Sequence, residues 1–184
     1  MNIANKLTLL RVVLVFVFMG VIWNPFLAPQ TSLWVGLVIF VGASFTDFLD
    51  GYLARKLNLV TNLGKFMDPL ADKMLVATAM IAIVDIGPLP AGSLPGWIVV
   101  VILLREFAVS GVRLAAANNN VVVAANFLGK VKTVVQMLMI IAYLIPIESV
   151  ILQTSAILLA YAALILTIVS GAQYIWQNKE ALKE

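Results

Sequence analysis

The sequence predicts an all-α integral membrane protein with six transmembrane helices and both termini in the cytoplasm. Of its 184 residues, 62% are hydrophobic and only 11% are charged, whereas a soluble domain has about 25% charged residues. The apolar residues form six stretches, each close to the roughly 20 residues that a spanning helix needs. Lys and Arg gather on one side of the topology that these stretches imply. We therefore expect residues 1–184 to form a single membrane domain.

Helix-breaking residues divide the apolar sequence into these six spans. In chain order, the expected spans cover about residues 7–23, 33–55, 65–86, 96–117, 127–145 and 150–176. The breakers beside them are Asn24-Pro25, Gly87-Pro88, Pro95, Asn118-Asn119-Asn120 and Pro146. No small-residue cleavage site follows the first span, so we interpret it as a retained helix and not as a signal peptide.

The positive charges predict the orientation. With six spans, both termini and the loops after the second and fourth spans share one side. The opposite loops, at about 24–32, 87–95 and 146–149, contain no Lys or Arg. The positive-inside rule therefore places the charged side in the cytoplasm. We expect a multi-pass protein of the cell membrane whose active site faces the cytoplasm.

The chain contains no cysteine and no histidine. This excludes a disulfide framework, a thiol nucleophile, the commonest zinc ligand and the usual general base near neutral pH. Acid–base chemistry would therefore depend on carboxylates, lysines or tyrosines.

Four aspartates lie close together in this apolar chain. Asp47 and Asp50 are near the end of the second span, and Asp68 and Asp72 are near the start of the third. Residues three or four apart share a helix face, and a short loop makes the two helices antiparallel neighbours. Four carboxylates would repel one another without cations, and Mg²⁺ or Mn²⁺ prefers oxygen ligands. Two such ions could clamp a phosphoryl group.

Small residues accompany the acids. Gly51 and Ala54 thin the helix face, and Gly64 does the same in the loop, so that a bulky ligand can approach the backbone. Arg55 can bind phosphate through two parallel hydrogen bonds. The alternative is a buried ion-pair network of the aspartates with Arg55, Lys65 and Lys73, but pairing does not explain the small residues.

This run resembles the signature of the CDP-alcohol phosphatidyltransferase family, D-x2-D-G-x2-A-R-x8-G-x3-D-x3-D. All the fixed positions are present, at Asp47, Asp50, Gly51, Ala54, Arg55, Gly64, Asp68 and Asp72. The resemblance covers essentially the whole chain, because the family's membrane fold also has six spans. It further suggests a homodimer. Gly36, Gly42 and Ala43 would permit close helix contact, either between subunits or within one.

The resemblance also implies roles for these residues. The four aspartates would bind two divalent metal ions, Mg²⁺ or Mn²⁺, and Asp72 would also be the general base. The CDP moiety would contact the small residues and the arginine of the signature, namely Gly51, Ala54, Arg55 and Gly64.

Three further segments resemble the branch of this family that makes phosphatidylglycerophosphate. They are residues 2–11, 104–113 and 129–136, and Ala4 departs from the proline expected in that branch. The implied reaction transfers the phosphatidyl group from CDP-diacylglycerol to glycerol 3-phosphate and releases CMP. Asn5 and Thr8 would join the CDP contacts, and Arg11 would support them, although a helix N-cap or flanking charge also explains such residues.

An anionic acceptor agrees with the basic residues of the later spans. Arg105, Arg113, Lys130 and Lys132 could surround a dianionic phosphate, and Glu106 would orient one of the basic side chains. Arg105 is the strongest of these candidates, because a charge in the middle of a span needs a partner or a function. The alternatives are a structural salt bridge for Arg105 and a purely topological role for the lysines.

Other functions remain open from the sequence alone. A transferase of the same family could use serine, inositol phosphate or phosphatidylglycerol as its acceptor. An intramembrane prenyltransferase also uses aspartates and magnesium, although at other spacings. A divalent-cation carrier would suit four intramembrane aspartates, but the outer half of the chain offers no polar relay. The expected partners are the two substrates and membrane lipid. We expect no nucleic-acid partner.

Overall fold

The computed structural model describes residues 3–56, 62–118 and 127–177, and these residues form six α-helices. Side chains are described for residues 8–46, 70–71, 73–113 and 127–177. The helices are α1 (Ile3–Ile22), α2 (Pro29–Lys56), α3 (Asn62–Ile86), α4 (Gly96–Asn118), α5 (Phe127–Leu144) and α6 (Val150–Gln177). In the described part of the chain, the prediction of six helices in this order is confirmed.

Glycine and proline define the connection between α3 and α4. Gly87 follows the last residue of α3 with φ of 84°, a left-handed conformation that ends a helix without strain only at glycine. Leu89 and Gly92 then exchange backbone hydrogen bonds of 3.1 and 2.7 Å, with φ of 94° at Gly92. The chain therefore reverses within a few residues and enters α4 directly after Pro95.

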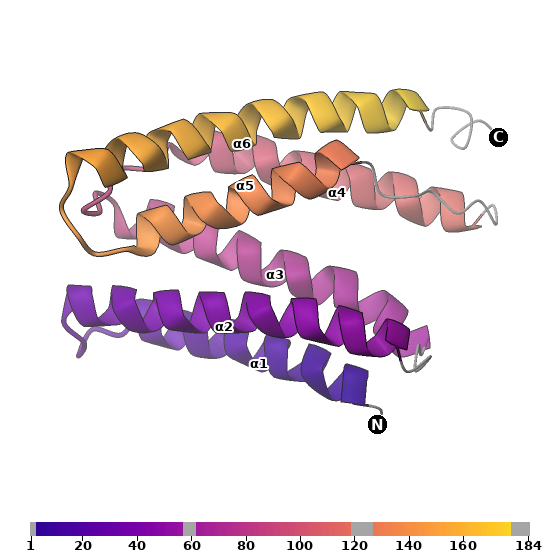
Figure 1. Cartoon of the computed structure of the whole chain (residues 1–184), viewed down its shortest axis with the longest axis horizontal. Coiled ribbons are helices and arrows are strands. Elements are labelled where there is room, and N and C mark those ends of the chain that lie inside the picture. Colours follow the sequence, from indigo (N-terminus) through magenta and orange to yellow (C-terminus); the bar gives the residue numbers. More distant parts are fainter. Residues whose placement is uncertain (1–2, 57–61, 119–126, 178–184) are drawn as a thin grey trace.

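The helices run lengthwise along one bundle, with α5 against α6 and α1 against both α2 and α3 (Figure 1). The packing of α4 is mainly against α6, and its contact with α3 is slight. The starts of α1, α3 and α5 and the ends of α2, α4 and α6 lie towards one end of the bundle. We call this the terminal end, and the opposite end, with connections at 23–28, 87–95 and 145–149, the loop end.

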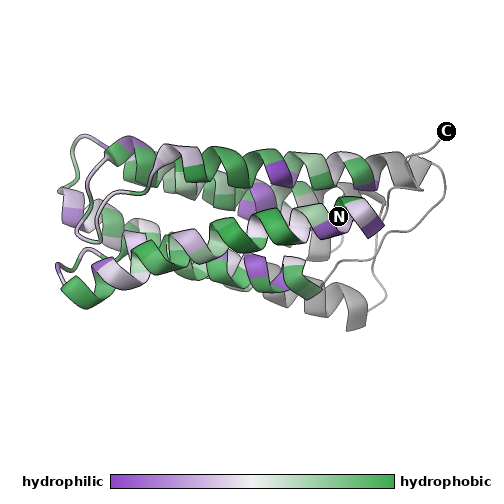
Figure 2. Ribbon diagram, turned by 90° about the horizontal axis from the view of Figure 1, so that it is seen from above, coloured by the Kyte–Doolittle hydropathy of each residue, from purple (hydrophilic) through white to green (hydrophobic). Residues whose placement is uncertain are grey.

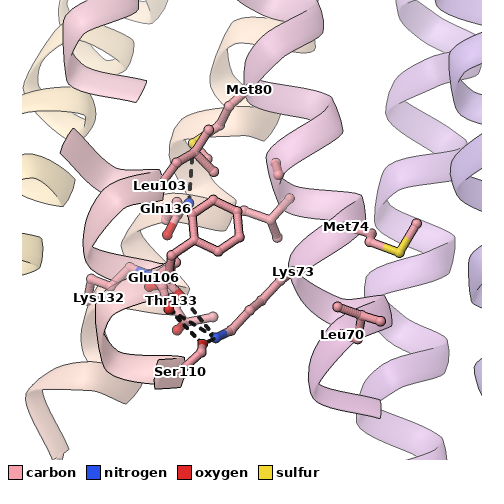
Figure 3. A pocket seen from close by; sticks show the side chains of 13 residues that line it. Leu70, Lys73, Met74, Met80, Leu103, Glu106, Ser110, Lys132, Thr133 and Gln136 are labelled. Carbon is pink, nitrogen blue, oxygen red and sulfur yellow. Dashed lines mark hydrogen bonds and ion pairs between the residues drawn. The ribbon is translucent and has the colours of Figure 1, made fainter. Parts of the chain in front are cut away.

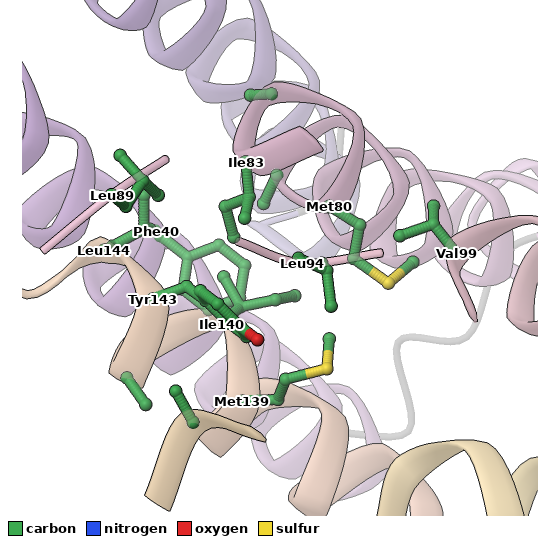
Figure 4. Packing of buried hydrophobic residues seen from close by; sticks show 14 of the residues in the cluster. Phe40, Met80, Ile83, Leu89, Leu94, Val99, Met139, Ile140, Tyr143 and Leu144 are labelled. Atoms are coloured by element: carbon green, nitrogen blue, oxygen red, sulfur yellow. The ribbon is translucent and has the colours of Figure 1, made fainter. Parts of the chain in front are cut away.

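The buried interior changes in character along the bundle. Towards the loop end, all six helices contribute to one apolar core, in which Phe40, Met80, Ile140 and Tyr143 are at most 1% exposed (Figure 4). Towards the terminal end, the interior also contains buried polar or charged side chains. They are Thr8, Arg11, Lys132, Gln136, Thr167 and Ser170. Polar groups are costly inside an apolar bundle unless they are paired, so this end is where function is expected.

The exterior of the bundle is apolar. Large hydrophobic side chains point outward from every helix, for example Phe16, Val38, Phe107 and Leu158, which are 61–70% exposed. Figure 2 shows hydrophobic residues along most of each helix. A soluble protein rarely exposes so much apolar surface, so the natural surroundings of these helices are lipid tails. The chain is a membrane protein.

Length and composition agree with this conclusion. Within the described residues, three helices contain a window apolar enough to cross a membrane, at Pro29–Thr46, Phe127–Leu144 and Val150–Gln177. The six helices have 18 to 28 residues, which corresponds to about 27–42 Å at 1.5 Å per residue. The hydrocarbon core of a bilayer is about 30 Å thick.

The small residues of α2 serve different purposes. A Cβ atom added at Gly36 would lie 2.6 Å from Ile22 Cδ1, so this glycine allows α1 to approach α2 within the subunit. Ala43 is also fully buried inside the subunit. Gly42 faces outward, and a Cβ atom there would meet nothing within 4 Å. Of these three residues, only Gly42 is placed on the outer surface.

Candidate active site

The aspartate motif spans the facing ends of two helices that contact each other. Asp47 and Asp50 belong to the last turns of α2, and Asp68 and Asp72 belong to the first turns of α3, all at the terminal end (Figure 1). The helices are continuous through these positions, so the spacing within each pair gives a shared face. The side chains of the motif, and that of Asn5, lie outside the described residues. Carboxylate oxygens are ligands of the kind that Mg²⁺ and Mn²⁺ prefer.

Two candidate residues of α1 are deeply buried beside this motif. Thr8 is 3% exposed and Arg11 is 0% exposed. Since α1 packs only against α2 and α3 among the described helices, both side chains face the helices that carry the aspartates. A buried arginine requires compensating negative charge or hydrogen bonds. Arg11 is therefore more than a flanking charge that orients the first span.

A basic cavity of about 340 Å³ lies beside the motif, between α3, α4, α5 and α6. Its lining, which defines what we call the basic cavity, consists of Lys73, Arg105, Glu106, Val109, Arg113, Gly129, Lys130, Thr133, Val134 and Tyr174. Four cations and one carboxylate leave an excess of three positive charges (4 − 1) in this lining. A small dianion would find compensation here, and the volume is within the range of sites for small molecules.

The basic cavity contains three of the four residues that the sequence suggested for the acceptor phosphate. Arg105 and Arg113 reach it from α4, and Lys130 reaches it from the start of α5. Lys132 does not line it. Its side chain is 3% exposed and lies on the other face of α5, with Nζ 2.5 Å from Glu106 Oε1.

Glu106 connects three cations from three helices. Its carboxylate lies 2.5 Å from Lys132 Nζ, 3.0 Å from Arg105 Nη1 and 3.7 Å from Lys73 Nζ. Lys73 also donates to the backbone oxygen of Glu106 at 3.3 Å and to Ser110 Oγ. Figure 3 shows Lys73 reaching across from α3 to these groups on α4. Since α3 and α4 make little other contact, the side chain of Lys73 bridges the gap between them.

The two arginines of α4 are held by α6. Arg105 Nη2 donates to Ser170 Oγ at 2.9 Å, in addition to its ion pair with Glu106. Arg113 Nε donates to the hydroxyl of Tyr174 at 3.1 Å, and its guanidinium carbon lies 5.5 Å from the centroid of the same ring. A salt bridge from Arg105 to Glu106, which the sequence left open as an alternative, is present, although Arg105 also lines the basic cavity.

An apolar pocket of about 210 Å³ adjoins the basic cavity. Leu70, Met74 and Met80 of α3 and Phe107 of α4 form much of its lining (Figure 3). Three side chains, Lys73, Glu106 and Thr133, line both spaces. A charged space and an apolar space thus meet at one boundary, which is the arrangement that joining a polar molecule to a lipid requires.

The sequence did not single out several residues of this site. Lys73 was interpreted only as a flanking charge or ion-pair partner of the aspartates. Ser170 and Tyr174 were not considered, although Thr167, Ser170, Gly171 and Tyr174 recur at helical spacing in a largely apolar helix. That periodic polar face was the available signal.

Comparison with known proteins shows similarity over most of the chain. The family model described as CDP-alcohol phosphatidyltransferase matches residues 1–169. A Bacillus subtilis protein named CDP-diacylglycerol–glycerol-3-phosphate 3-phosphatidyltransferase is 45% identical, over 99% of this chain and 97% of its own length. A protein of the same name from Salmonella paratyphi A is 36% identical, over 95% of this chain and 93% of its own. A Mycobacterium tuberculosis protein named probable phosphatidylglycerophosphate synthase is 37% identical, over 95% of this chain and 80% of its own length.

Proposed function

Because this chain belongs to the CDP-alcohol phosphatidyltransferase family, we propose that it transfers the phosphatidyl group of CDP-diacylglycerol to glycerol 3-phosphate. The products are phosphatidylglycerophosphate and CMP, the former a precursor of phosphatidylglycerol. The chain is a CDP-diacylglycerol-dependent phosphatidyltransferase, in accordance with relatives that are 35–45% identical over nearly its full length.

The basic cavity is the observation that supports glycerol 3-phosphate as the acceptor. Arg105, Arg113, Lys130 and Lys73 give it an excess of positive charge, which suits a phosphate dianion. Serine is a zwitterion and would not require this excess. The cavity volume of about 340 Å³ also suits a three-carbon phosphate better than a second complete phospholipid.

The aspartate motif would hold the metal ions. Asp47, Asp50, Asp68 and Asp72 supply the carboxylates, and two bound Mg²⁺ or Mn²⁺ ions would compensate the charge of the pyrophosphate of CDP-diacylglycerol. The CDP moiety contacts Gly51, Ala54, Arg55 and Gly64, with Asn5 and Thr8 from α1 beside it. Arg11 supports this region from the buried face of α1.

In the reaction, the residues orient the acceptor and move one proton. The basic cavity binds the phosphate of glycerol 3-phosphate, and Asp72 accepts the proton of its attacking hydroxyl. The hydroxyl oxygen forms a bond to the phosphorus that carries the diacylglycerol. The bond from that phosphorus to the oxygen of CMP breaks, and Arg55 stabilises the charge on the departing CMP. In a chain without histidine, a carboxylate is a reasonable base.

We further propose that the protein is an enzyme of the cell membrane. It would have six membrane spans, with both termini in the cytoplasm. Helices of 18 to 28 residues and the absence of Lys and Arg from the loop-end connections support this topology. The active site then opens to the cytoplasm, where glycerol 3-phosphate is dissolved, and CDP-diacylglycerol enters sideways from the bilayer. A homodimer is the expected assembly.

An acceptor screen tests the proposal. Detergent-purified protein is given CDP-diacylglycerol with glycerol 3-phosphate, serine, inositol phosphate or phosphatidylglycerol, each with Mg²⁺, with Mn²⁺ or with a chelator. Among the four acceptors, we expect only glycerol 3-phosphate to give metal-dependent release of CMP. Turnover with another acceptor, or undiminished turnover after complete chelation, would contradict the proposal. Metal uptake into proteoliposomes without CDP-lipid would favour a cation carrier instead.

A further inference from the structure

One face of α6 contains buried polar side chains, although most of the helix is apolar. The residues of this face are Thr167, Ser170, Gly171 and Tyr174, at positions i, i+3, i+4 and i+7. Ser170 is 0% exposed and Tyr174 is 2% exposed. The face lies against α4, the helix that carries Arg105 and Arg113.

We propose that Tyr174 is a positioning residue of the acceptor site, which holds the guanidinium of Arg113 in the orientation that binds the acceptor phosphate. This inference rests on the proposed function, since it concerns the same basic cavity. Tyr174 lies outside the signature at residues 47–72, and its role is inferred from its contacts with α4.

Tyr174 constrains Arg113 in two ways. Its hydroxyl accepts a hydrogen bond from Arg113 Nε at 3.1 Å, and its ring lies under the guanidinium at 5.5 Å from the centroid. With Nε directed to the tyrosine, the Nη edge of the guanidinium is the part that can form parallel hydrogen bonds to phosphate. A free arginine side chain loses rotamer entropy when it is fixed. Holding the side chain before binding reduces that cost.

The tyrosine is itself held by α4. Its ring belongs to a small buried cluster with Val109 and Val112, which are 4% and 9% exposed. These valines precede Arg113 by four residues and by one residue, so the ring contacts the helical turn that leads to the arginine. The ring therefore fixes the position of Arg113 relative to both α4 and the basic cavity.

The neighbouring residues of the same face hold the second arginine. Ser170 Oγ accepts a hydrogen bond from Arg105 at 2.9 Å, and a Cβ atom at Gly171 would lie 2.9 Å from Arg105 Cγ. Gly171 thus lets the arginine side chain cross directly over the α6 backbone. One face of α6, which lies outside the aspartate motif, therefore positions both arginines of the basic cavity.

The alternative role for a tyrosine near a helix end is anchoring at the membrane interface. Burial argues against it, because Tyr174 is 2% exposed, whereas Trp176 on the same turn is 76% exposed. Trp176 is in the position to contact lipid headgroups, and Tyr174 faces the interior.

The test combines Tyr174→Phe, Arg113→Ala and their double variant, with Tyr161→Phe as the matched control. Tyr161 is on the same helix but is 46% exposed on its outer face. Tyr174→Phe keeps the ring and removes the hydroxyl that accepts the hydrogen bond from Arg113 Nε. We expect it to raise KM for glycerol 3-phosphate roughly tenfold, with kcat and KM for CDP-diacylglycerol within about twofold of wild type. In the Arg113→Ala background, the same change should have no further effect.

Calorimetric binding of glycerol 3-phosphate, without CDP-diacylglycerol, makes the test independent of turnover. We expect Tyr174→Phe to raise the Kd for glycerol 3-phosphate in the wild-type background and to have no further effect on it in the Arg113→Ala background. Equal effects of Tyr174→Phe in both backgrounds, a change confined to kcat, or wild-type protein that binds no glycerol 3-phosphate would overturn the inference. Wild-type protein that binds glycerol 3-phosphate with the expected coupling but makes no product would instead overturn the proposed function and leave the role of Tyr174 in place.

Discussion

Lys132 Nζ lies 2.5 Å from Glu106 Oε1, and this pair joins α5 to α4 at the boundary between the basic cavity and the apolar pocket. The pair is largely buried, with side-chain exposures of 3% and 18%. The carboxylate also pairs with Arg105 and Lys73, so this one acid contacts three positive charges. Glu106 therefore has an organising role and is not free to take part in proton transfer.

Glu106→Gln should destabilise the protein strongly. Removing one partner of a buried ion pair leaves the other charge uncompensated and costs on the order of 3 kcal/mol. We expect a clear fall in Tm for the detergent-solubilised protein, measured by its intrinsic fluorescence. Glu148→Gln, at an exposed position of the loop end, is the control and should leave Tm unchanged.

A second variant separates charge from packing at this site. Glu106→Gln combined with Lys132→Met removes both charges and keeps the volume of the lysine stem, so part of the lost stability should return. If the double variant is less stable than Glu106→Gln alone, the uncompensated charge of Lys132 is not the cause of the instability.

Lys130→Ala and Lys132→Ala should have different effects, although the residues are two positions apart. Lys130 lines the basic cavity, so its loss should raise KM for glycerol 3-phosphate more than KM for CDP-diacylglycerol and leave Tm nearly unchanged. Lys132 pairs with Glu106, so its loss should mainly lower Tm. Steady-state kinetics with each substrate varied, together with thermal denaturation, distinguishes the two. A larger rise in KM for glycerol 3-phosphate with Lys132→Ala would restore Lys132 as a phosphate ligand.

Gly171→Ala should weaken acceptor binding through Arg105. The added Cβ atom would lie 2.9 Å from Arg105 Cγ and 3.4 Å from Nε, so the arginine must move away from α6. We expect at least a several-fold rise in KM for glycerol 3-phosphate. Gly20→Ala is the matched control in another helix, because a Cβ atom there meets nothing within 4 Å. Indistinguishable kinetics for the two variants would show that the position of Arg105 does not matter for binding.

Asp72→Asn should abolish turnover while CDP-diacylglycerol still binds. The amide has nearly the shape of the carboxylate but cannot accept the proton of the attacking hydroxyl. Release of CMP and binding of radiolabelled CDP-diacylglycerol to the purified variant are the two measurements. Near-normal activity of the variant would remove Asp72 from its assigned role as the base.

The sequence predicted the number and order of the helices well, because Pro, Gly and Asn mark most of their ends. The predicted starts were less accurate. We placed the second helix from about residue 33, whereas α2 begins at Pro29. Proline is favoured in the first turn of a helix, but hydrophobicity alone locates only the apolar part. The same reasoning explains why α1 and α3 begin a few residues before the predicted spans.

The side-chain partners were harder to predict. Lys130 and Lys132 were grouped together, although positions two apart on a helix point about 200° apart and cannot share a face. Only one of them therefore lines the cavity. The contacts of Tyr174 with Arg113 could not be predicted, because they depend on α4 and α6 packing side by side, 61 residues apart in sequence. Local spacing defines a face of a helix but not its partner.

The boundary formed by Lys73, Glu106 and Thr133 has a consequence for inhibitor chemistry. A compound confined to the basic cavity would need a strongly anionic group, which limits its passage through membranes. A compound that places a smaller acid beside Arg113 and extends a short alkyl or aryl arm past Thr133 towards Met80 could gain much of its affinity from apolar contact. Substitutions at Thr133 would then be the expected route to resistance, since that side chain lines both spaces.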